Sequence, residues 1–207
     1  MSKKKITIID YGMGNIASLK NAFTYLGAEV VVTDDPEKIK NSNYVILPGV
    51  GSFKRAMEQI KRRNIDDAII ETAKKGNYIF GICLGMQLMG ASSTEDSYTK
   101  GIGLIDNEVI RFSTNDTKGN KIPHVGFNSV NFEKKNSLFK GLKDGSDFYF
   151  VHSFYMSPKN LKCQISTSNY GINFLSSFHK DNICATQFHP EKSQGNGLQL
   201  IKNFLNF

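Results

Sequence analysis

The first half of the chain alternates short apolar runs with longer segments of helical periodicity. Four apolar runs have the length of buried strands: 6–10, 29–33, 44–47 and 78–82. Between them, apolar residues spaced three or four apart predict helices at 15–26, 53–60 and 65–73, and Pro36 opens a shorter helix. Strands that alternate with helices predict an α/β fold with a doubly wound, mostly parallel sheet.

The second half follows a different pattern. Six further stretches are predicted as strands: 104–112, 129–132, 148–153, 164–167, 173–178 and 183–188. The glycines and asparagines between them are typical of hairpins, so we expect an antiparallel extension of the sheet. The closing "NGLQLIKNFLNF" predicts an amphipathic helix with Leu198, Ile201 and Leu205 facing inward. Because no linker or repeat divides the sequence, residues 1–207 are predicted to form a single domain.

Composition narrows the possible functions. Hydrophobic residues make up 40% and charged residues 22% of the chain, as in ordinary globular proteins. The net charge is +7, but the lysines are scattered and no arginine-rich helix occurs, which argues against nucleic-acid binding. The three cysteines, Cys83, Cys163 and Cys184, have neither a disulfide pattern nor metal-ligand spacing. We therefore expect a cytoplasmic protein that uses no metal and no cofactor.

Cys83 lies where a predicted strand turns into a helix. The stretch "YIFGICLGMQLMG" (78–90) contains Gly81-Ile82-Cys83-Leu84-Gly85, after which an amphipathic helix is expected. A residue at such a turn is exposed above the sheet, and the flanking glycines avoid clashes, as in the nucleophile elbow G-x-S-x-G. The N–H groups at the start of the helix can bind an oxyanion. Cys83 is thus a candidate nucleophile, and a small buried core cysteine is the alternative.

A base and an oxyanion hole can be placed at the same sheet edge. His189 follows the predicted strand 183–188, and Glu191 can accept the second ring N–H and fix the tautomer. "LPGVGSF" (47–53) follows another strand, and its glycines let backbone N–H groups approach a substrate closely. Taken alone, this motif would be interpreted as a turn.

Six motifs in order resemble the class-I (triad-type) glutamine amidotransferases over essentially the whole chain: "DYGMGN", "LPGVGSF", "GICLGMQ", "HVGFN", "FYFVHSFY" and "QFHPEKSQ". The resemblance implies the flavodoxin-like fold of that family and hydrolysis of glutamine through a cysteine thioester. "DYGMGN", "HVGFN" and "YFVHS" resemble, more narrowly, the subunits that supply ammonia in histidine biosynthesis.

The resemblance also implies the roles of individual residues. The catalytic residues are then Cys83, His189 and Glu191. The oxyanion hole is then formed by backbone N–H groups of Leu84 and of Val50 or Gly51. Glutamine is then bound by Gly49, Gln87, Glu95, His152, Ser153 and Phe154.

A partner chain is implied in the same way. Ammonia must pass directly to an acceptor, because free ammonia becomes protonated at neutral pH, and the sequence has no room for an acceptor domain. By resemblance, the acceptor is a (β/α)₈-barrel cyclase subunit bound as a heterodimer, with Asn15, Phe127, Tyr149 and Lys192 at the interface. Family members more often have tryptophan at Phe127 and tyrosine at Phe154, so the packing of this wall departs from the family pattern.

Three alternatives stay open at this point. A paralogous glutaminase subunit could feed another acceptor, such as a surface-sugar amidotransferase, with the same three catalytic residues. A cysteine peptidase or chaperone-like hydrolase would give no reason for "PGVG" and "HPEKS" together. A non-enzymatic regulatory subunit would be expected to lack one of the catalytic residues, and all three are present.

Overall fold

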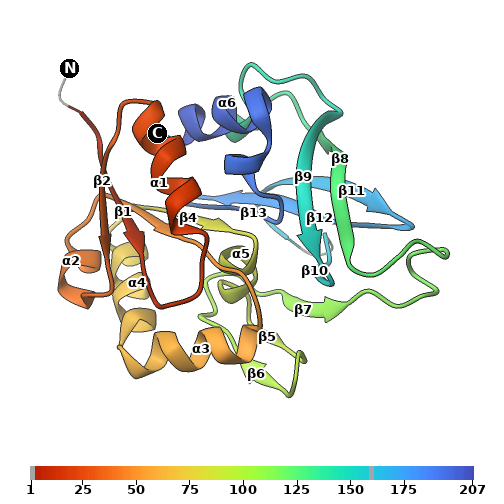
Figure 1. Ribbon diagram of the computed structural model, residues 1–207, viewed down its shortest axis with the longest axis horizontal. Helices are drawn as coiled ribbons and strands as arrows, with labels where there is room; N and C mark the ends of the chain where they lie inside the picture. The colour runs from red at the N-terminus through yellow and green to blue at the C-terminus, as the bar shows by residue number, and fades with distance from the viewer. Residues whose placement is uncertain (1–2, 159–160) are drawn as a thin grey trace.

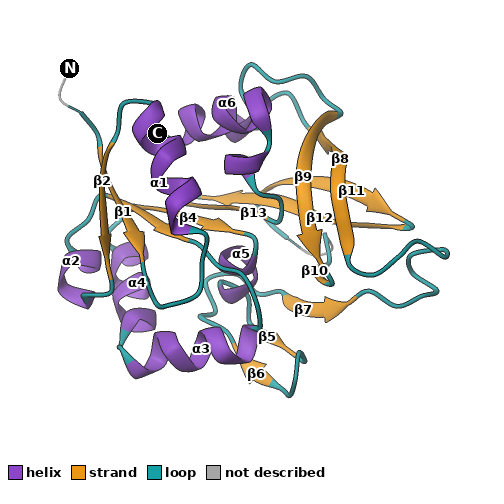
Figure 2. Ribbon diagram, viewed as in Figure 1, coloured by secondary structure: helices purple, strands orange, loops and turns teal. Residues whose placement is uncertain are grey.

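The computed structural model describes residues 3–158 and 161–207 and shows a mixed sheet between two layers of helices (Figure 1, Figure 2). The strands are β1 (Lys5–Ile9), β2 (Glu29–Thr33), β3 (Tyr44–Leu47), β4 (Tyr78–Ile82), β5 (Ser92–Ser93), β6 (Thr99–Lys100), β7 (Glu108–Arg111), β8 (His124–Phe132), β9 (Ser146–His152), β10 (Phe154–Met156), β11 (Gln164–Tyr170), β12 (Ile172–Lys180) and β13 (Ile183–Thr186). The helices are α1 (Ile16–Tyr25), α2 (Pro36–Lys40), α3 (Phe53–Arg62), α4 (Ile65–Lys74), α5 (Leu84–Leu88) and α6 (Gln194–Phe204), with short 3₁₀ turns η1 (Ser137–Phe139) and η2 (Pro190–Lys192).

The main sheet has nine strands in the order β2-β1-β3-β4-β13-β12-β11-β8-β9. β2, β1, β3, β4 and β13 are parallel, and the strands from β12 onward are antiparallel. The predicted parallel half with an antiparallel extension is therefore confirmed. Although β13 comes from the second half of the sequence, it pairs in parallel with β4, so the two strands end at the same edge of the sheet.

Alternating side chains divide the interior into two cores. In β3, Val45 and Leu47 face the core shared with α2, α3 and α4, whereas Ile46 faces the core shared with α1 and α6. Figure 1 shows these two groups of helices on opposite sides of the sheet. Because both faces of β3, β4 and β13 are covered, these central strands are almost continuously apolar in sequence.

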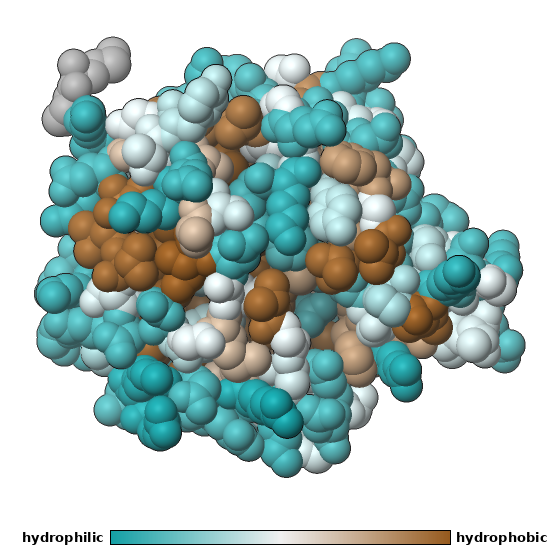
Figure 3. All heavy atoms as spheres, viewed as in Figure 1, coloured by the Kyte–Doolittle hydropathy of each residue, from teal (hydrophilic) through white to brown (hydrophobic). Residues whose placement is uncertain are grey.

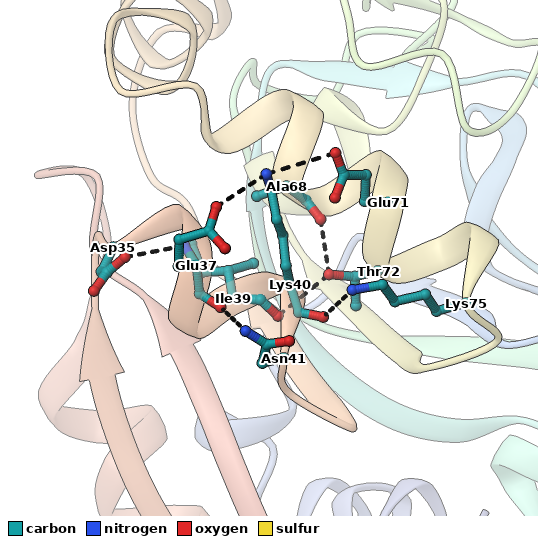
Figure 4. A network of polar contacts seen from close by, with 9 residues as sticks. All are labelled: Asp35, Glu37, Ile39, Lys40, Asn41, Ala68, Glu71, Thr72 and Lys75. Carbon is teal, nitrogen blue, oxygen red and sulfur yellow. Dashed lines mark hydrogen bonds and ion pairs between the residues drawn. The ribbon is translucent and has the colours of Figure 1, made fainter.

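Helices α2 and α4 are joined by the polar network drawn in Figure 4. The buried Thr72 hydroxyl donates to the Ile39 and Ala68 carbonyls, at 3.2 and 2.7 Å. Lys40 lies between Glu37 and Glu71, at 3.2 and 3.5 Å. Because both glutamates are exposed, the ion pairs contribute little, and the buried hydroxyl is the main polar anchor of α2.

Several predicted boundaries are wrong for identifiable reasons. The strand expected at 104–112 is reduced to β7, because the N–H groups of Leu104 and Ile105 bond back to the Met89 carbonyl at 2.9 and 3.1 Å. The strand expected at 183–188 ends at Thr186, whose hydroxyl donates to the Phe188 carbonyl.

Three short strands, β5, β6 and β10, give no periodic signal and were not predicted, and β8 is longer than the predicted 129–132. The helix after Cys83, α5, has five residues and is buried on every side, not amphipathic, because it packs against α3, β4 and β13. Within residues 3–158 and 161–207, we find no helix with the length and apolar character needed to cross a membrane.

Candidate active site

Three adjacent parallel strands bring the predicted motifs to one edge of the sheet. β3 pairs with β4 at Leu47 and Gly81, and β4 pairs with β13 at Ile82 and Thr186. The segment after each strand therefore emerges beside the next, which is where open α/β sheets place their sites. "PGVG", Cys83 and His189 follow these three strand ends, so the sequence correctly predicts their common location.

Cys83 has the backbone conformation of a sharp elbow. Its φ and ψ angles are 55° and −111°, a combination that glycine normally occupies in type II′ turns. The Cys83 N–H donates to the Thr186 carbonyl at 2.8 Å, which holds the elbow against β13. A β-carbon on Gly85 would overlap the Leu47 carbonyl oxygen, so the glycine permits the close approach of α5 to β3.

His189 and Glu191 form a buried pair behind the nucleophile. His189 Nδ1 lies 2.8 Å from Glu191 Oε1, and the side chains are 3% and 1% exposed. Burial lowers the pKa of His189, but the Cys83 thiolate and the Glu191 carboxylate together raise it to about 10. Nε2 is buried and has no hydrogen-bond partner within the described part of the chain. The imidazole is thus oriented by Glu191 and electrostatically coupled to Cys83.

Two residues fix the backbone around His189. The His189 N–H donates to the Tyr149 carbonyl at 2.9 Å, and the Ser193 hydroxyl donates to the His189 carbonyl at 2.6 Å. The same hydroxyl accepts from the Tyr149 N–H at 3.0 Å. Strand β9 is therefore tied directly to the histidine.

A cavity of about 500 Å³ opens over Cys83. It is lined by Val50, Gly51, Ser52, Cys83, Leu84, Gln87, Glu95, Pro123, Val151, His152, Ser153 and Phe154. Nearly all predicted substrate and oxyanion residues are in this set, whereas Gly49, His189 and Glu191 lie outside it. A second hollow of about 490 Å³ lies among Lys3, Lys4, Lys5 and Lys38, and none of the residues around it is a nucleophile or base of the predicted type.

The "PGVG" loop is held at both ends. The Tyr11 hydroxyl donates to the Pro48 carbonyl at 2.8 Å, and the Phe53 N–H donates to Glu95 Oε2 at 2.8 Å. Within the loop, Gly49 packs closely against Tyr11, since a β-carbon there would lie 2.5 Å from the Tyr11 hydroxyl oxygen. Between these anchors, Val50 is 42% exposed and lies at the rim of the cavity.

Backbone donors suitable for an oxyanion line the cavity. Among the residues that the structure describes, the N–H groups of Val50 and Gly51 donate no hydrogen bond. Leu84 begins α5, so its N–H has no intrahelical acceptor. These are the groups that the sequence predicts for the oxyanion hole.

Gln187 is a site residue that the sequence analysis missed. Its Nε2 lies 3.8 Å from Cys83 Sγ, and its Oε1 accepts from Gln87 Nε2 at 2.9 Å. Gln87 Nε2 also donates to the Phe154 carbonyl at 2.9 Å. Gln187 directly follows the last residue of β13, and no local sequence pattern identifies it.

Glu95 lies in the turn between β5 and β6. Burial raises the pKa of its carboxyl, although the hydrogen bond from the Phe53 N–H opposes that shift. The neighbouring Asp96 accepts from the Ser52 hydroxyl at 2.7 Å. The turn therefore contacts the end of the "PGVG" loop as well as the cavity.

Three of the four predicted interface residues lie side by side on the surface. The Phe127 and Tyr149 rings are 5.6 Å apart, and Lys192 Nζ lies 5.7 Å from the Tyr149 ring centre. Phe127 is 52% exposed, and Val125 on the same strand is 55% exposed. Asn15 precedes α1, which packs against η2. Figure 3 shows brown, hydrophobic surface over the region of β8 and β9, and more over the region of β1 and β2.

Comparison with known proteins agrees with this geometry. The family model described as glutamine amidotransferase class-I matches residues 7–206. The chain therefore belongs to the class-I glutamine amidotransferases. Among solved structures, a PurLQS structure from Thermotoga maritima aligns with a TM-score of 0.77 at 18% identity, covering 99% of both chains. The glutaminase domain of CTPS from Trypanosoma brucei aligns with a TM-score of 0.67 at 13% identity, covering 99% of this chain and 94% of that one. At these identities the likeness shows the fold.

Curated relatives specify the branch of the family. The chain is 44% identical to "Imidazole glycerol phosphate synthase subunit HisH" of Moorella thermoacetica, covering 97% of this chain and 94% of the relative. It is 43% identical to the protein of the same name from Chlorobaculum tepidum, covering 98% of this chain and 100% of the relative. Within the class-I family, the chain belongs to the HisH subunits of imidazole glycerol phosphate synthase.

Proposed function

We propose that this chain is the glutaminase subunit of imidazole glycerol phosphate synthase in histidine biosynthesis. It hydrolyses glutamine to glutamate and ammonia, and the ammonia passes to a cyclase subunit that makes imidazole glycerol phosphate and AICAR. The observation that carries the proposal is the strained Cys83 elbow facing a buried His189–Glu191 pair, in a chain of the HisH family.

The reaction follows from the arrangement of these groups. The Cys83 thiolate attacks the side-chain carboxamide of glutamine, forming a C–S bond, and the oxyanion is stabilised by N–H groups of Leu84 and of Val50 or Gly51. His189 donates its Nε2 proton to the leaving nitrogen, so that the C–N bond breaks and ammonia departs. Water, deprotonated by the same imidazole, then attacks the γ-glutamyl thioester, and the C–S bond breaks to release glutamate and regenerate the thiolate.

Substrate recognition is assigned to the walls of the cavity. Gln87, Glu95 and residues 152–154 all border it. A half-buried carboxylate such as Glu95 suits the α-ammonium group of glutamine. Gly49 acts indirectly, by letting the loop lie close to Tyr11 and Leu84.

The acceptor subunit is assigned to the surface formed by Asn15, Phe127, Tyr149 and Lys192. Exposed aromatic and apolar side chains beside a cation are typical of the centre and rim of a protein interface. We propose that a (β/α)₈-barrel cyclase docks there as a heterodimer in the cytoplasm and receives ammonia before it is protonated.

The decisive test compares two nitrogen sources. Cys83→Ala is expected to abolish glutamine-dependent turnover by the complex, while ammonium salt at alkaline pH still supports product formation on the partner. Cys163→Ser, which removes a half-buried thiol outside the cavity, is the matched control and should retain glutaminase activity. Retention of more than a few per cent of glutaminase activity by Cys83→Ala would overturn the nucleophile assignment.

A further inference from the structure

Two buried histidines face each other beside the candidate site. His124 begins β8, His152 ends β9, and the two are paired in the antiparallel ladder. His124 Nδ1 lies 3.0 Å from His152 Nε2, and the residues are 3% and 6% exposed. The proposed glutaminase reaction uses neither imidazole.

The neighbours of the pair determine where its protons lie. His152 Nδ1 is 2.8 Å from the Phe154 carbonyl, which can only accept, so this nitrogen carries the proton. In a neutral ring, His152 Nε2 is then an acceptor, and His124 Nδ1 must be the donor to it. His124 Nε2 is left as an acceptor, and the Asn128 amide Nδ2 lies 3.3 Å away as its donor. One orientation satisfies every bond, with all donors pointing from Asn128 toward Phe154.

The surroundings keep both rings neutral. His124 stacks on Phe150 and Tyr170, with ring centres 4.9 and 4.0 Å away. Burial lowers the pKa of His124 to about 4. Burial also lowers the pKa of His152, to about 3; the Phe154 carbonyl opposes the shift, whereas His124 and His189 add to it. His189 is the charged group that faces His152, so a positive charge on the His152 ring would be repelled by the His189 imidazolium.

The chain of hydrogen bonds continues to the nucleophile. The Phe154 carbonyl that accepts from His152 also accepts from Gln87 Nε2 at 2.9 Å. Gln87 Nε2 reaches Gln187 Oε1, and Gln187 Nε2 contacts Cys83 Sγ at 3.8 Å. A displacement of His124 or His152 can therefore reach Cys83 through a continuous set of hydrogen bonds.

The same two strands present the proposed docking surface on their outer side. Val125 and Phe127 alternate with the inward His124 along β8 and are each more than half exposed. Opposite them, Val151 and Tyr149 alternate with the inward His152 along β9. A partner that shifts these strands moves the histidine pair with them.

We propose that His124 and His152 form a neutral, proton-ordered pair that positions the Phe154 carbonyl and, through Gln87 and Gln187, the Cys83 thiol. His124 is a positioning residue, and it links the β8–β9 docking surface to the nucleophile. This inference rests on the proposed glutaminase function for its kinetic consequences, but the proton order is a property of the folded chain alone.

Nitrogen NMR of the unmodified protein tests the proton order. The chain has four histidines, so their ring signals can be resolved and assigned. At neutral pH both His124 and His152 should show a protonated Nδ1 and a lone-pair Nε2. A protonated Nε2 in either neutral ring, or a charged ring, would overturn the proposal without any variant having to fold.

Substitutions at His124 test the coupling to Cys83 in a Cys163→Ser background. His124→Phe keeps a ring but removes the donor to His152, and should lower kcat for glutamine about tenfold with KM little changed. The rate of Cys83 alkylation by chloroacetamide should change in parallel. His124→Asn, whose amide can replace the Nδ1 donor, should recover most of both losses.

His179→Phe is the matched control, because His179 bonds to Ser137 and the Asp181 carbonyl, away from this chain of contacts. Equal losses in His124→Phe and His124→Asn, or a loss as large in His179→Phe, would reduce the effect to general destabilisation and refute the coupling. Unchanged kinetics in His124→Phe would refute it as well. Activity that survives Cys83→Ala would instead contradict the proposed function, and the NMR result would stand on its own.

Discussion

The strain at Cys83 can be measured by replacing it with glycine and with alanine. Both changes remove the thiol, but only alanine keeps a β-carbon at φ 55° and ψ −111°. Sparsely populated backbone conformations cost about 1–3 kcal/mol, and this one is mostly reserved for glycine, so about 2.5 kcal/mol is expected here. Against this stand about 0.8 kcal/mol for the lost methyl burial and about 0.7 kcal/mol for the greater freedom of unfolded glycine. Cys83→Gly should therefore be more stable than Cys83→Ala by about 1 kcal/mol.

Urea unfolding of the two variants at constant m-value gives the difference directly. The matched control is the same pair of substitutions at Cys184, a fully buried residue in the regular strand β13. There the glycine variant should be the less stable by about 1.5 kcal/mol, because no strain is relieved. A Cys83→Gly variant less stable than Cys83→Ala would refute the strained elbow. The expected result would show that the chain keeps a destabilising conformation in order to place the thiol of Cys83, a residue only 6% exposed, against the cavity.

Two further predictions concern charge in the interior. Glu191→Gln removes the carboxylate that helps to raise the pKa of His189, so that pKa should fall and kcat should drop by at least about 100-fold without unfolding, checked by histidine NMR and glutaminase assay. The pKa values of His124 and His152 are lowered to about 4 and about 3 in the folded chain. Below about pH 6.5 these two rings therefore bind protons in the unfolded chain while they remain neutral in the folded chain. The free energy of unfolding should accordingly fall as the pH drops from about 6.5 toward 4, by up to about 1.4 kcal/mol per pH unit for each ring. Urea unfolding of His124→Phe should show a shallower slope over this range, and an unchanged slope would contradict the assignment.

Local sequence patterns predicted the parallel half of the fold and the elbow because both depend on short-range chemistry. Apolar runs identify β1 to β4, and Gly81 and Gly85 mark a turn whose steric demands are readable from the sequence. Shorter elements escaped prediction: β5 and β6 have two residues each, which is too few for a period to appear. The same limit hid β10, which has three residues and follows directly after a longer predicted strand.

The contacts that escaped prediction at the site depend on long-range register. His124 and His152 meet only because β8 and β9 pair with one particular alignment, and no local signal specifies it. Gln187 reaches Cys83 only because β13 returns to pair in parallel with β4. Local motifs predicted the candidate triad, and the family resemblance supplied the substrate-binding residues, whereas the hydrogen bonds that connect them had to come from the three-dimensional arrangement.

The "PGVG" loop has the structure expected of a gated oxyanion hole. The Pro48 carbonyl and the Phe53 N–H are fixed by Tyr11 and Glu95, whereas the peptide between Val50 and Gly51 has no hydrogen bond to either side among the described residues. Gly51 has φ +104°, a conformation that only glycine adopts easily. Rotation of this peptide can therefore add or remove one oxyanion donor while the ends of the loop stay in place.

We expect the free subunit to be nearly inactive and the acceptor-loaded partner to select the competent peptide orientation. A missing oxyanion donor costs about 10²- to 10³-fold in rate, so docking should raise glutaminase turnover by at least that order. Gly51→Ala should reduce this activation more than it weakens glutamine binding, since an L-residue restricts the rotation. Gly76→Ala, at a similar positive φ of 78° after α4, is the control and should activate normally. The measurement is single-turnover thioester formation on Cys83 with and without the partner and its nucleotide substrate. Equal rates in both states would mean that the oxyanion hole is preformed, because docking would then not change the orientation of the Val50–Gly51 peptide.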